Sequence, residues 1–106
     1  MINYDDFAKL EIKIGKVIAA EKIENTDKLL RLEVDFGDEK RQIVSGIAEH
    51  YQPENLIGRE FPFLTNLEPR TLKGVESQGM ILAIGTEEKI VLIEPAEEVP
   101  PGSKIS

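Results

Sequence analysis

The sequence predicts an all-β fold: a five-stranded Greek-key barrel with short helices and a C-terminal extension. Short segments in which apolar and polar residues alternate have the period of half-buried strands, and turn-forming residues separate them. The length of 106 residues, with 41% apolar and 31% charged residues, suits one modest core. We therefore expect a single domain over residues 1–106.

The chain is expected to begin with a short helix over Tyr4–Leu10. Asn3 is a typical helix N-cap, and Asp5-Asp6 favour the first turn because the N-terminus of a helix is electropositive. Phe7 and Leu10 would share one face of this helix. We expect that face to cover an opening of the barrel.

A long first strand follows the helix. Ile12 and Ile14 alternate with a lysine, and the alternation slips at Gly15-Lys16 before it resumes at Val17. A glycine at such a slip predicts a β-bulge, which bends the strand. One bent strand can then serve both halves of a barrel.

The second and third strands form the most regular pattern in the chain. Leu30–Phe36 alternates apolar and charged residues, and Gly37-Asp38-Glu39 predicts a hairpin turn. The chain should return as a third strand over Gln42–Ile47, with Ser45-Gly46 near its end.

A short helical turn is expected between the third and fourth strands. Proline starts the segment Pro53–Ile57, and Gly58 follows it, as at many helix ends. Phe61–Phe63 marks the fourth strand. Pro62 inside that strand favours an edge or an irregular position, because proline cannot donate to a neighbouring strand.

The last strands are expected over Met80–Ile84 and Ile90–Ile93, joined by Gly85–Lys89. Pro95, Pro100, Pro101 and Gly102 then predict an extended, irregular tail. Five or more short strands with a helix between the third and fourth are typical of an OB-fold. An SH3-like barrel is the main alternative, although it usually lacks the inserted helix.

Composition bounds the location and chemistry. No apolar run approaches the ~20 residues that cross a bilayer, and the acidic N-terminus is not a secretion signal. No cysteine is present, which excludes disulfides and thiolate metal sites. We expect a cytoplasmic protein without a membrane partner.

Catalytic residues are poorly supplied. His50 is the only histidine, so no imidazole pair exists for a metal site, and it is expected to be an ordinary surface residue. Ser45 does not lie in a Gly-x-Ser-x-Gly motif, and no phosphate-binding Gly-rich loop is present. The sequence therefore predicts no catalytic residues, no metal and no cofactor.

Binding residues are better supplied, at the predicted strand ends. Ser45, Asn66, Ser77 and Gln78 offer donors and acceptors, Met80 offers an apolar surface for a base, and the cations Lys28, Arg31, Arg70 and Lys73 could reach phosphates. The alternative is local: Asn66 and Ser77 could close turns, and Met80 could belong to the core. The net charge of −7 argues against a nucleic-acid partner, but the basic residues gather in the first strands while acidic residues crowd the ends, so a polarised surface is possible.

These strand-end segments resemble one family. In order along the chain they are Asp6-Phe7-Ala8-Lys9, Asp27-Lys28-Leu29, Ser45-Gly46-Ile47, Asn66-Leu67-Glu68-Pro69-Arg70 and Ser77-Gln78-Gly79-Met80. Together they resemble the tRNA-binding OB-fold domain at the C-terminus of methionyl-tRNA synthetase. The same domain occurs as a separate beta chain, as a stand-alone tRNA-binding protein and in cytokine-like synthetase cofactors. The resemblance covers Ile2 to Ile105.

The resemblance implies a tRNA-binding module without its own active site. In the family the domain contacts the tRNA elbow or outer corner with little sequence preference and assists the synthetase, whose catalytic chain is a possible partner. The residues carried over for tRNA contact are Lys28, Ser77 and Met80, with Ser45 and Asn66 as neighbours. Arg70 completes the candidate RNA-binding set through its reach to phosphates.

The resemblance also implies a homodimer in which the C-terminal segment helps to form the interface. The apolar residues Phe61 and Phe63 and the run Ile90–Ile93 exceed what we expect so small a barrel to bury, which supports the same expectation. The alternative function is a protein-interaction or chaperone-like homodimeric module of a synthetase complex, favoured by the acidic surface.

Overall fold

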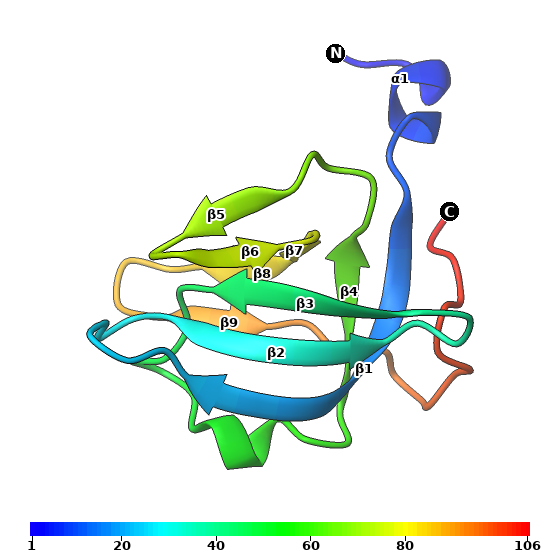
Figure 1. The fold of residues 1–106 in the computed structure, drawn as a ribbon. Helices are drawn as coiled ribbons and strands as arrows, with labels where there is room; N and C mark the ends of the chain where they lie inside the picture. Colours follow the sequence, from blue (N-terminus) through cyan, green and yellow to red (C-terminus); the bar gives the residue numbers. More distant parts are fainter.

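The computed structural model describes residues 1–106 as a five-stranded antiparallel sheet that curls into a nearly closed barrel (Figure 1). Its spatial order is β3-β2-β1-β4-β7. The predicted all-β, OB-fold-like barrel is therefore confirmed. The strands of this sheet are β1 (Ile12–Lys22), β2 (Leu30–Asp35), β3 (Lys40–Ser45), β4 (Glu60–Leu64) and β7 (Met80–Ile81).

Two small hairpins and two short helices complete the fold. β5 (Arg70–Leu72) pairs with β6 (Val75–Ser77), and β8 (Ala83–Gly85) pairs with β9 (Ile90–Leu92). The helices are α1 (Tyr4–Ala8) and the 3-10 turn η1 (Pro53–Asn55). The predicted last strand over Met80–Ile84 is thus divided: its first residues pair with β4, and those after Leu82 pair with β9.

The core lies inside the barrel, and the alternation of β2 fills it as predicted. Leu30, Leu32 and Val34 have no exposed area. Phe61 and Phe63 are equally buried, and Phe63 packs edge to face on Phe36 with ring centroids 5.4 Å apart. The argument for a dimer from Phe61 and Phe63 was therefore wrong, because a single chain buries both rings.

β1 bends as expected, but its irregularity lies beyond the predicted position. The register against β2 shifts between Val17 and Ala19, not at Gly15-Lys16. Gly15 has another role. A Cβ there would lie 2.7 Å from Cε1 of Phe36 and closer still to Val34, so glycine permits β2 to pack against β1.

Pro62 does not lie at an edge, so of the two positions expected for it, an edge or an irregular one, the first was wrong. β4 pairs with β1 on one side and with β7 on the other. Opposite Pro62, the N–H and C=O of Ile14 bond to Ser103 and Gly102 instead, so β1 loses no partner. The Pro62 carbonyl still accepts the N–H of Leu82 (3.0 Å). The missing proline donor thus costs only one bond, at the end of short β7.

α1 begins as predicted but does not cover the barrel. Asn3 and Asp6 form a reciprocal capping box, with a distance of 3.0 Å from the Asp6 nitrogen to Asn3 Oδ1. No residue of the helix is buried, and Figure 1 places it beyond the N-terminal start of β1. The expectation of a cover over the barrel opening was therefore wrong, because the chain between α1 and β1 carries the helix clear of the core.

The C-terminal tail is extended, as predicted, and it lies along β1. The Ile105 N–H donates to the Ile12 carbonyl at 2.8 Å, and Lys104 forms an isolated bridge with Lys13. The tail thus covers an edge of the first half of β1 that the sheet leaves unpaired. No helix of the structure has the length and apolar character needed to span a membrane.

Candidate nucleic-acid interface

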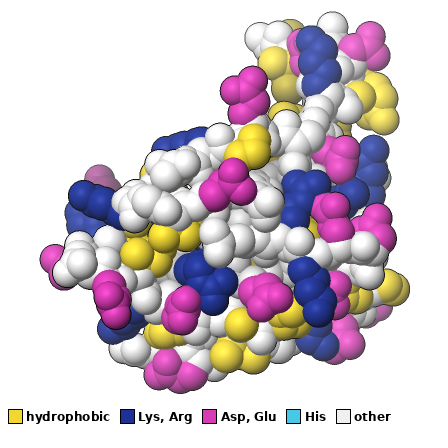
Figure 2. Space-filling view, viewed as in Figure 1, with side chains coloured by type: hydrophobic (Ala, Val, Ile, Leu, Met, Phe, Trp, Pro, Cys, Tyr) yellow, Lys and Arg dark blue, Asp and Glu magenta, His cyan; other side chains and the backbone are white.

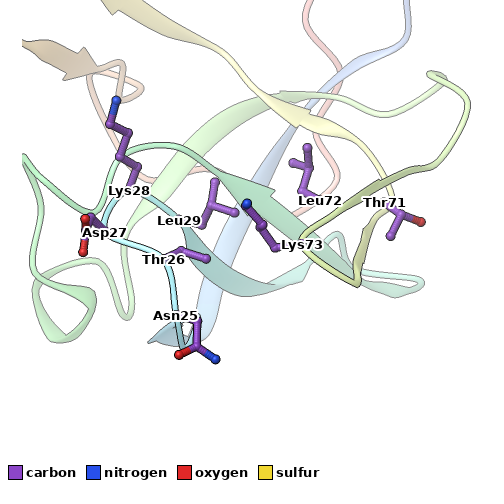
Figure 3. Close-up of a pocket in the computed structure, with 8 residues that line it drawn as sticks. All are labelled: Asn25, Thr26, Asp27, Lys28, Leu29, Thr71, Leu72 and Lys73. Atoms are coloured by element: carbon purple, nitrogen blue, oxygen red, sulfur yellow. The ribbon is translucent and has the colours of Figure 1, made fainter.

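An open groove of about 530 Å³ lies between the β1–β2 loop and the β5–β6 hairpin. The loop supplies one wall and the hairpin supplies the other (Figure 3). The lining residues are Asn25, Thr26, Asp27, Lys28, Leu29, Thr71, Leu72 and Lys73.

The β1–β2 loop is fixed by its own hydrogen bonds. The hydroxyl of Thr26 donates to the carbonyl of Ile23 at 2.8 Å, and the Ile23 N–H donates to the carbonyl of Leu29 at 3.2 Å. The backbone carbonyl of Lys28 accepts the N–H of Ala48 at 2.9 Å. The backbone of Lys28 is therefore anchored while its exposed side chain is free to meet a ligand.

The β5–β6 hairpin is the wall that the sequence analysis did not predict as a strand pair. Its turn consists of Lys73 and Gly74, both in the left-handed region with φ of 50° and 81°. In Figure 3, Lys73 extends from this turn toward Leu29, and the Lys28 side chain extends away from Asp27. A Lys-Gly pair between short polar segments was the signal that could have predicted this hairpin.

A smaller cavity of about 40 Å³ adjoins the groove, and Leu72 borders both. Three predicted site residues meet there: Arg70, Ser77 and Met80. Arg70 and Met80 are exposed, and Met80 retains 41% of its accessible area. The interpretation of Met80 as a core residue is therefore excluded.

Ser77 lies at the same cavity but is 4% exposed. Its hydroxyl accepts the N–H of Val44 and donates to the carbonyl of Gly79, both at 2.9 Å. Next to it, the Gln78 side chain accepts the N–H of Gln42 at 3.0 Å. These side chains join the β6–β7 segment to β3 across the seam of the barrel.

Asn66 is not brought into this group. Its side-chain oxygen accepts the N–H of Glu11 at 2.9 Å, and its amide donates to the carbonyl of Lys9 at 2.7 Å. It holds the segment between α1 and β1. Ser45 is half-buried at the end of β3, opposite Leu30.

Three basic residues at the groove and the adjoining cavity form no ion pair. The chain has 13 lysines and arginines, and five of them form ion pairs. Lys28, Arg70 and Lys73 are not among the five. Arg31, a further candidate, pairs with Glu21 at 2.7 Å. Positive charge at the groove is therefore available to an incoming anion.

The face that Figure 2 shows is not strongly polarised. Basic and acidic side chains are interspersed there, with apolar groups between them. The polarised surface considered from the sequence is not visible on this face.

Two ion pairs away from the groove lower the pKa values of their carboxyl groups. The Arg59 guanidinium, 2.7 Å from Glu94, lowers the pKa of that carboxyl and has its own pKa raised in return, chiefly through the shared hydrogen bond. Hydrogen bonds from Lys13 and Thr65 likewise lower the pKa of Glu11. No group of three or more acidic or histidine side chains is placed to hold a metal ion.

A match over residues 12–104 assigns the chain to a protein family described as "Putative tRNA binding domain". The chain belongs to this tRNA-binding family. The match includes both walls of the groove and every predicted site residue. The predicted resemblance is thus confirmed for the family.

Curated relatives of this tRNA-binding family member include methionine–tRNA ligases. Identity is 51% over 105 residues with the ligase of Methanococcus aeolicus, 50% over 105 residues with that of Thermotoga maritima, and 54% over 105 residues with that of Methanoregula boonei. These matches cover 99% of this chain but only 16% to 17% of the length of each ligase. The chain is thus similar to one small part of those enzymes.

Solved structures show the same fold over the whole chain. A protein from Pyrococcus horikoshii described as MetRS-related has a TM-score of 0.95 and 48% identity, covering 100% of this chain and 98% of its own. The chaperone CsaA of Bacillus anthracis has a TM-score of 0.90 and 35% identity, covering 100% and 99%. The C-terminal domain of Plasmodium vivax p43 has a TM-score of 0.88 and 32% identity, covering 96% and 62%.

Proposed function

We propose that this domain binds folded tRNA at the groove between the β1–β2 loop and the β5–β6 hairpin, and that it has no active site of its own. The observation that carries the proposal is the pair of lysines without acidic partners, Lys28 and Lys73, on opposite walls of one groove in a tRNA-binding family member. Two cations on facing walls suit a phosphate backbone or a projecting nucleotide that lies between them.

Within this proposal the predicted site residues divide into two roles. Lys28 and Arg70 contact phosphates, and Met80 offers an exposed apolar face to a base or ribose. Ser45, half-buried at the end of β3, adds a hydroxyl near the β1–β2 loop. Ser77 acts differently, since its hydroxyl already has two partners inside the protein and so positions the hairpin wall.

Asn66 has a supporting role in this proposal, since its side-chain oxygen and nitrogen both form hydrogen bonds with the α1–β1 connection.

The domain is expected to assist methionyl-tRNA synthetase. Its ligase relatives carry a segment of this kind within a much longer chain, so the domain would add tRNA contacts to a catalytic unit. With a net charge of −7, affinity must come from local contacts and from shape, which is how folded RNA is generally recognised. We expect weak, salt-sensitive binding by the isolated domain.

The test is tRNA binding across a salt series, followed by fluorescence anisotropy. Lys28→Ala and Lys73→Ala should each weaken binding and reduce the log–log salt slope by roughly 0.7 to 0.9, the value of one phosphate. Lys40→Ala is the matched control. This exposed lysine has no acidic partner, and it starts β3 at the turn of the β2–β3 hairpin, whereas Lys28 lies beyond the opposite end of that hairpin. It should leave the slope nearly unchanged.

Three outcomes would contradict this function. Absence of binding at low salt would refute tRNA recognition. Equal affinity for an unstructured polynucleotide would refute recognition of shape. Equal losses from Lys40→Ala and Lys28→Ala would place the interface outside the groove.

A homodimer forms part of the same proposal. The tail from Pro95 to Ile105 lies on β1, and exposed Ile93, with 38% of its area accessible, lies just before the tail. A second copy would cover this surface, as two-fold dimers commonly do. Light scattering coupled to size exclusion should give about twice the mass of 11.9 kDa, and the mass of one chain at micromolar concentrations would contradict it.

A chaperone-like interaction module is the second candidate. The likeness to CsaA at 35% identity favours it, as do apolar side chains that no element covers, such as Ile2, Tyr4 and Ile84. This function predicts that the domain suppresses aggregation of an unfolded test protein. Lys28→Ala should leave that activity intact while it weakens tRNA binding.

A further inference from the structure

Two leucines line the groove, one on each wall. Leu29 lies on the loop wall directly before β2, and Leu72 is the last residue of β5 on the hairpin wall (Figure 3). Both are half-buried, yet neither belongs to the core cluster or to the side chains packed against it. The apolar surface that they leave exposed is therefore part of the groove and does not serve the core.

This apolar surface extends beyond the groove and has cations beside it. Leu72 also borders the adjoining cavity, where Met80 retains 41% of its accessible area. Lys28 and Lys73 line the groove, Arg70 lines the cavity, and none of the three forms an ion pair. An apolar surface beside free cations matches a nucleotide, in which the face of a base is joined to a phosphate.

The leucines decide which part of an RNA the groove can hold. A phosphate lying against them would lose its water without gaining a hydrogen-bond donor. A duplex keeps its bases stacked inside the helix and offers only their edges, whereas an unpaired base can leave the stack and expose its face. The groove volume of about 530 Å³ is of the size of small-ligand sites, which span roughly 300–1,000 Å³. One unstacked base therefore suits the groove better than a backbone alone.

We infer, on the basis of the tRNA site proposed above, that the groove receives one unpaired nucleobase between Leu29 and Leu72. The face of the base lies on the leucine side chains, as apolar side chains hold extruded bases in other proteins. The lysines of the two walls bind the phosphates on either side of that nucleotide. The exposed side chains of Asn25 and Thr71, which also line the groove, are available to the edge of the base. The substrate class is thus RNA with an unpaired loop or bulge nucleotide.

Three RNA duplexes of one sequence test this inference by fluorescence anisotropy at constant salt. One is fully paired, one carries a single bulged adenosine, and one carries an abasic residue at the bulge. The abasic bulge keeps the interrupted helix and the extra phosphate, so its comparison with the adenosine bulge isolates the base. Wild-type protein should bind the adenosine bulge about tenfold more tightly than either other RNA, a factor within the range of one stacked base.

Variants of the leucines should remove this preference. Leu29→Ala and Leu72→Ala should each bring the affinity for the adenosine bulge to within about threefold of that for the abasic bulge, with the salt slope unchanged because leucine releases no counterion. Ile57→Ala is the matched control, since this isoleucine is 50% exposed and does not line the groove. It should keep the full preference. Lys28→Ala should weaken binding of both bulged RNAs by the same factor.

Equal affinity of the wild-type protein for the adenosine and abasic bulges would overturn the inference. The proposed tRNA function would still stand in that case if Lys28→Ala weakened tRNA binding, whereas absence of tRNA binding at low salt would refute the function itself. Equal effects of Leu72→Ala and Ile57→Ala would also overturn the inference, as would leucine variants that weaken both bulged RNAs alike. The wild-type comparison needs no variant, so it decides the question even if a leucine variant fails to fold.

Discussion

Replacing Ser77 with alanine should destabilise the fold, because the Ser77 hydroxyl closes the seam between β6 and β3. The residue is 4% exposed, and its oxygen bonds both the N–H of Val44 and the carbonyl of Gly79 at 2.9 Å. Alanine removes the acceptor of the Val44 N–H inside the protein. An unsatisfied buried donor costs about 1–3 kcal/mol.

That cost is measurable as a fall in the melting temperature. For a domain of about this size, each kcal/mol lowers Tm by roughly 4–8 °C. Ser77→Ala should therefore lower Tm by about 4 °C at the least and by about 24 °C at most, as followed by circular dichroism. The salt slope of tRNA binding, measured well below this Tm, should remain near that of the wild type because a neutral hydroxyl releases no counterion.

Ser45→Ala is the matched control. It makes the same chemical change in a half-buried residue of β3 whose hydroxyl forms no hydrogen bond within the protein. Its Tm should stay close to that of the wild type. Equal Tm values for Ser77→Ala and Ser45→Ala would refute the seam argument, and a wild-type Tm combined with lost tRNA binding would make Ser77 a direct contact.

Three further outcomes are expected. Gly15→Ala should cost about 1–3 kcal/mol through overpacking, whereas Gly46→Ala, which meets no atom within 4 Å, should be nearly neutral in urea unfolding. The pKa of Glu94 is lowered from its ordinary 4.5, so its ion pair with Arg59 stabilises the fold above that pH. This stabilisation is lost as pH falls through the lowered pKa, and Glu94→Gln should make unfolding less dependent on pH in that range. Met80→Ala should weaken tRNA binding with little change in Tm, since the residue is 41% exposed.

The strands of the barrel were predictable wherever one face is buried. The alternation in Leu30–Phe36 identified three fully buried residues, because in a half-buried strand every second residue is apolar and faces the core. The same reasoning failed for Phe61–Phe63, which is buried on both sides and carries Pro62 without being an edge. A run that is apolar on both faces holds no information about its neighbours.

The β5–β6 hairpin and the direction of α1 could not be read from period or composition. The strands of the hairpin have three residues each, and the only buried one is the polar Ser77, so they carry no apolar alternation. α1 has aromatic and apolar residues that suggested burial, yet Tyr4 is 75% exposed. Its placement depends on Asn66, which lies more than fifty residues away and holds the chain at Glu11.

The polar strand ends identified the candidate site but not the role of each residue. Serine and asparagine suit both ligand contact and backbone support, because their side chains bond either water or a buried N–H equally well. Lys28 was distinguishable, since a lysine in a turn is seldom buried. Only the distance between Ser77 and Val44 in the folded chain reveals which hydroxyl is already occupied.

Closure of the barrel and the shape of the groove depend on the same few polar bonds. Gln42 and Gln78 bond each other twice across the seam, through the Gln78 N–H at 2.8 Å and its side-chain oxygen at 3.0 Å. Arg41 adds a bond to the Gln78 carbonyl from the same strand. These bonds fix the β5–β6 hairpin relative to β3, and the hairpin carries Lys73 while the β1–β2 loop carries Lys28. The separation of the two lysines, on which the proposed RNA contact depends, is therefore set by Arg41, Gln42 and Gln78, which lie in the seam and do not line the groove.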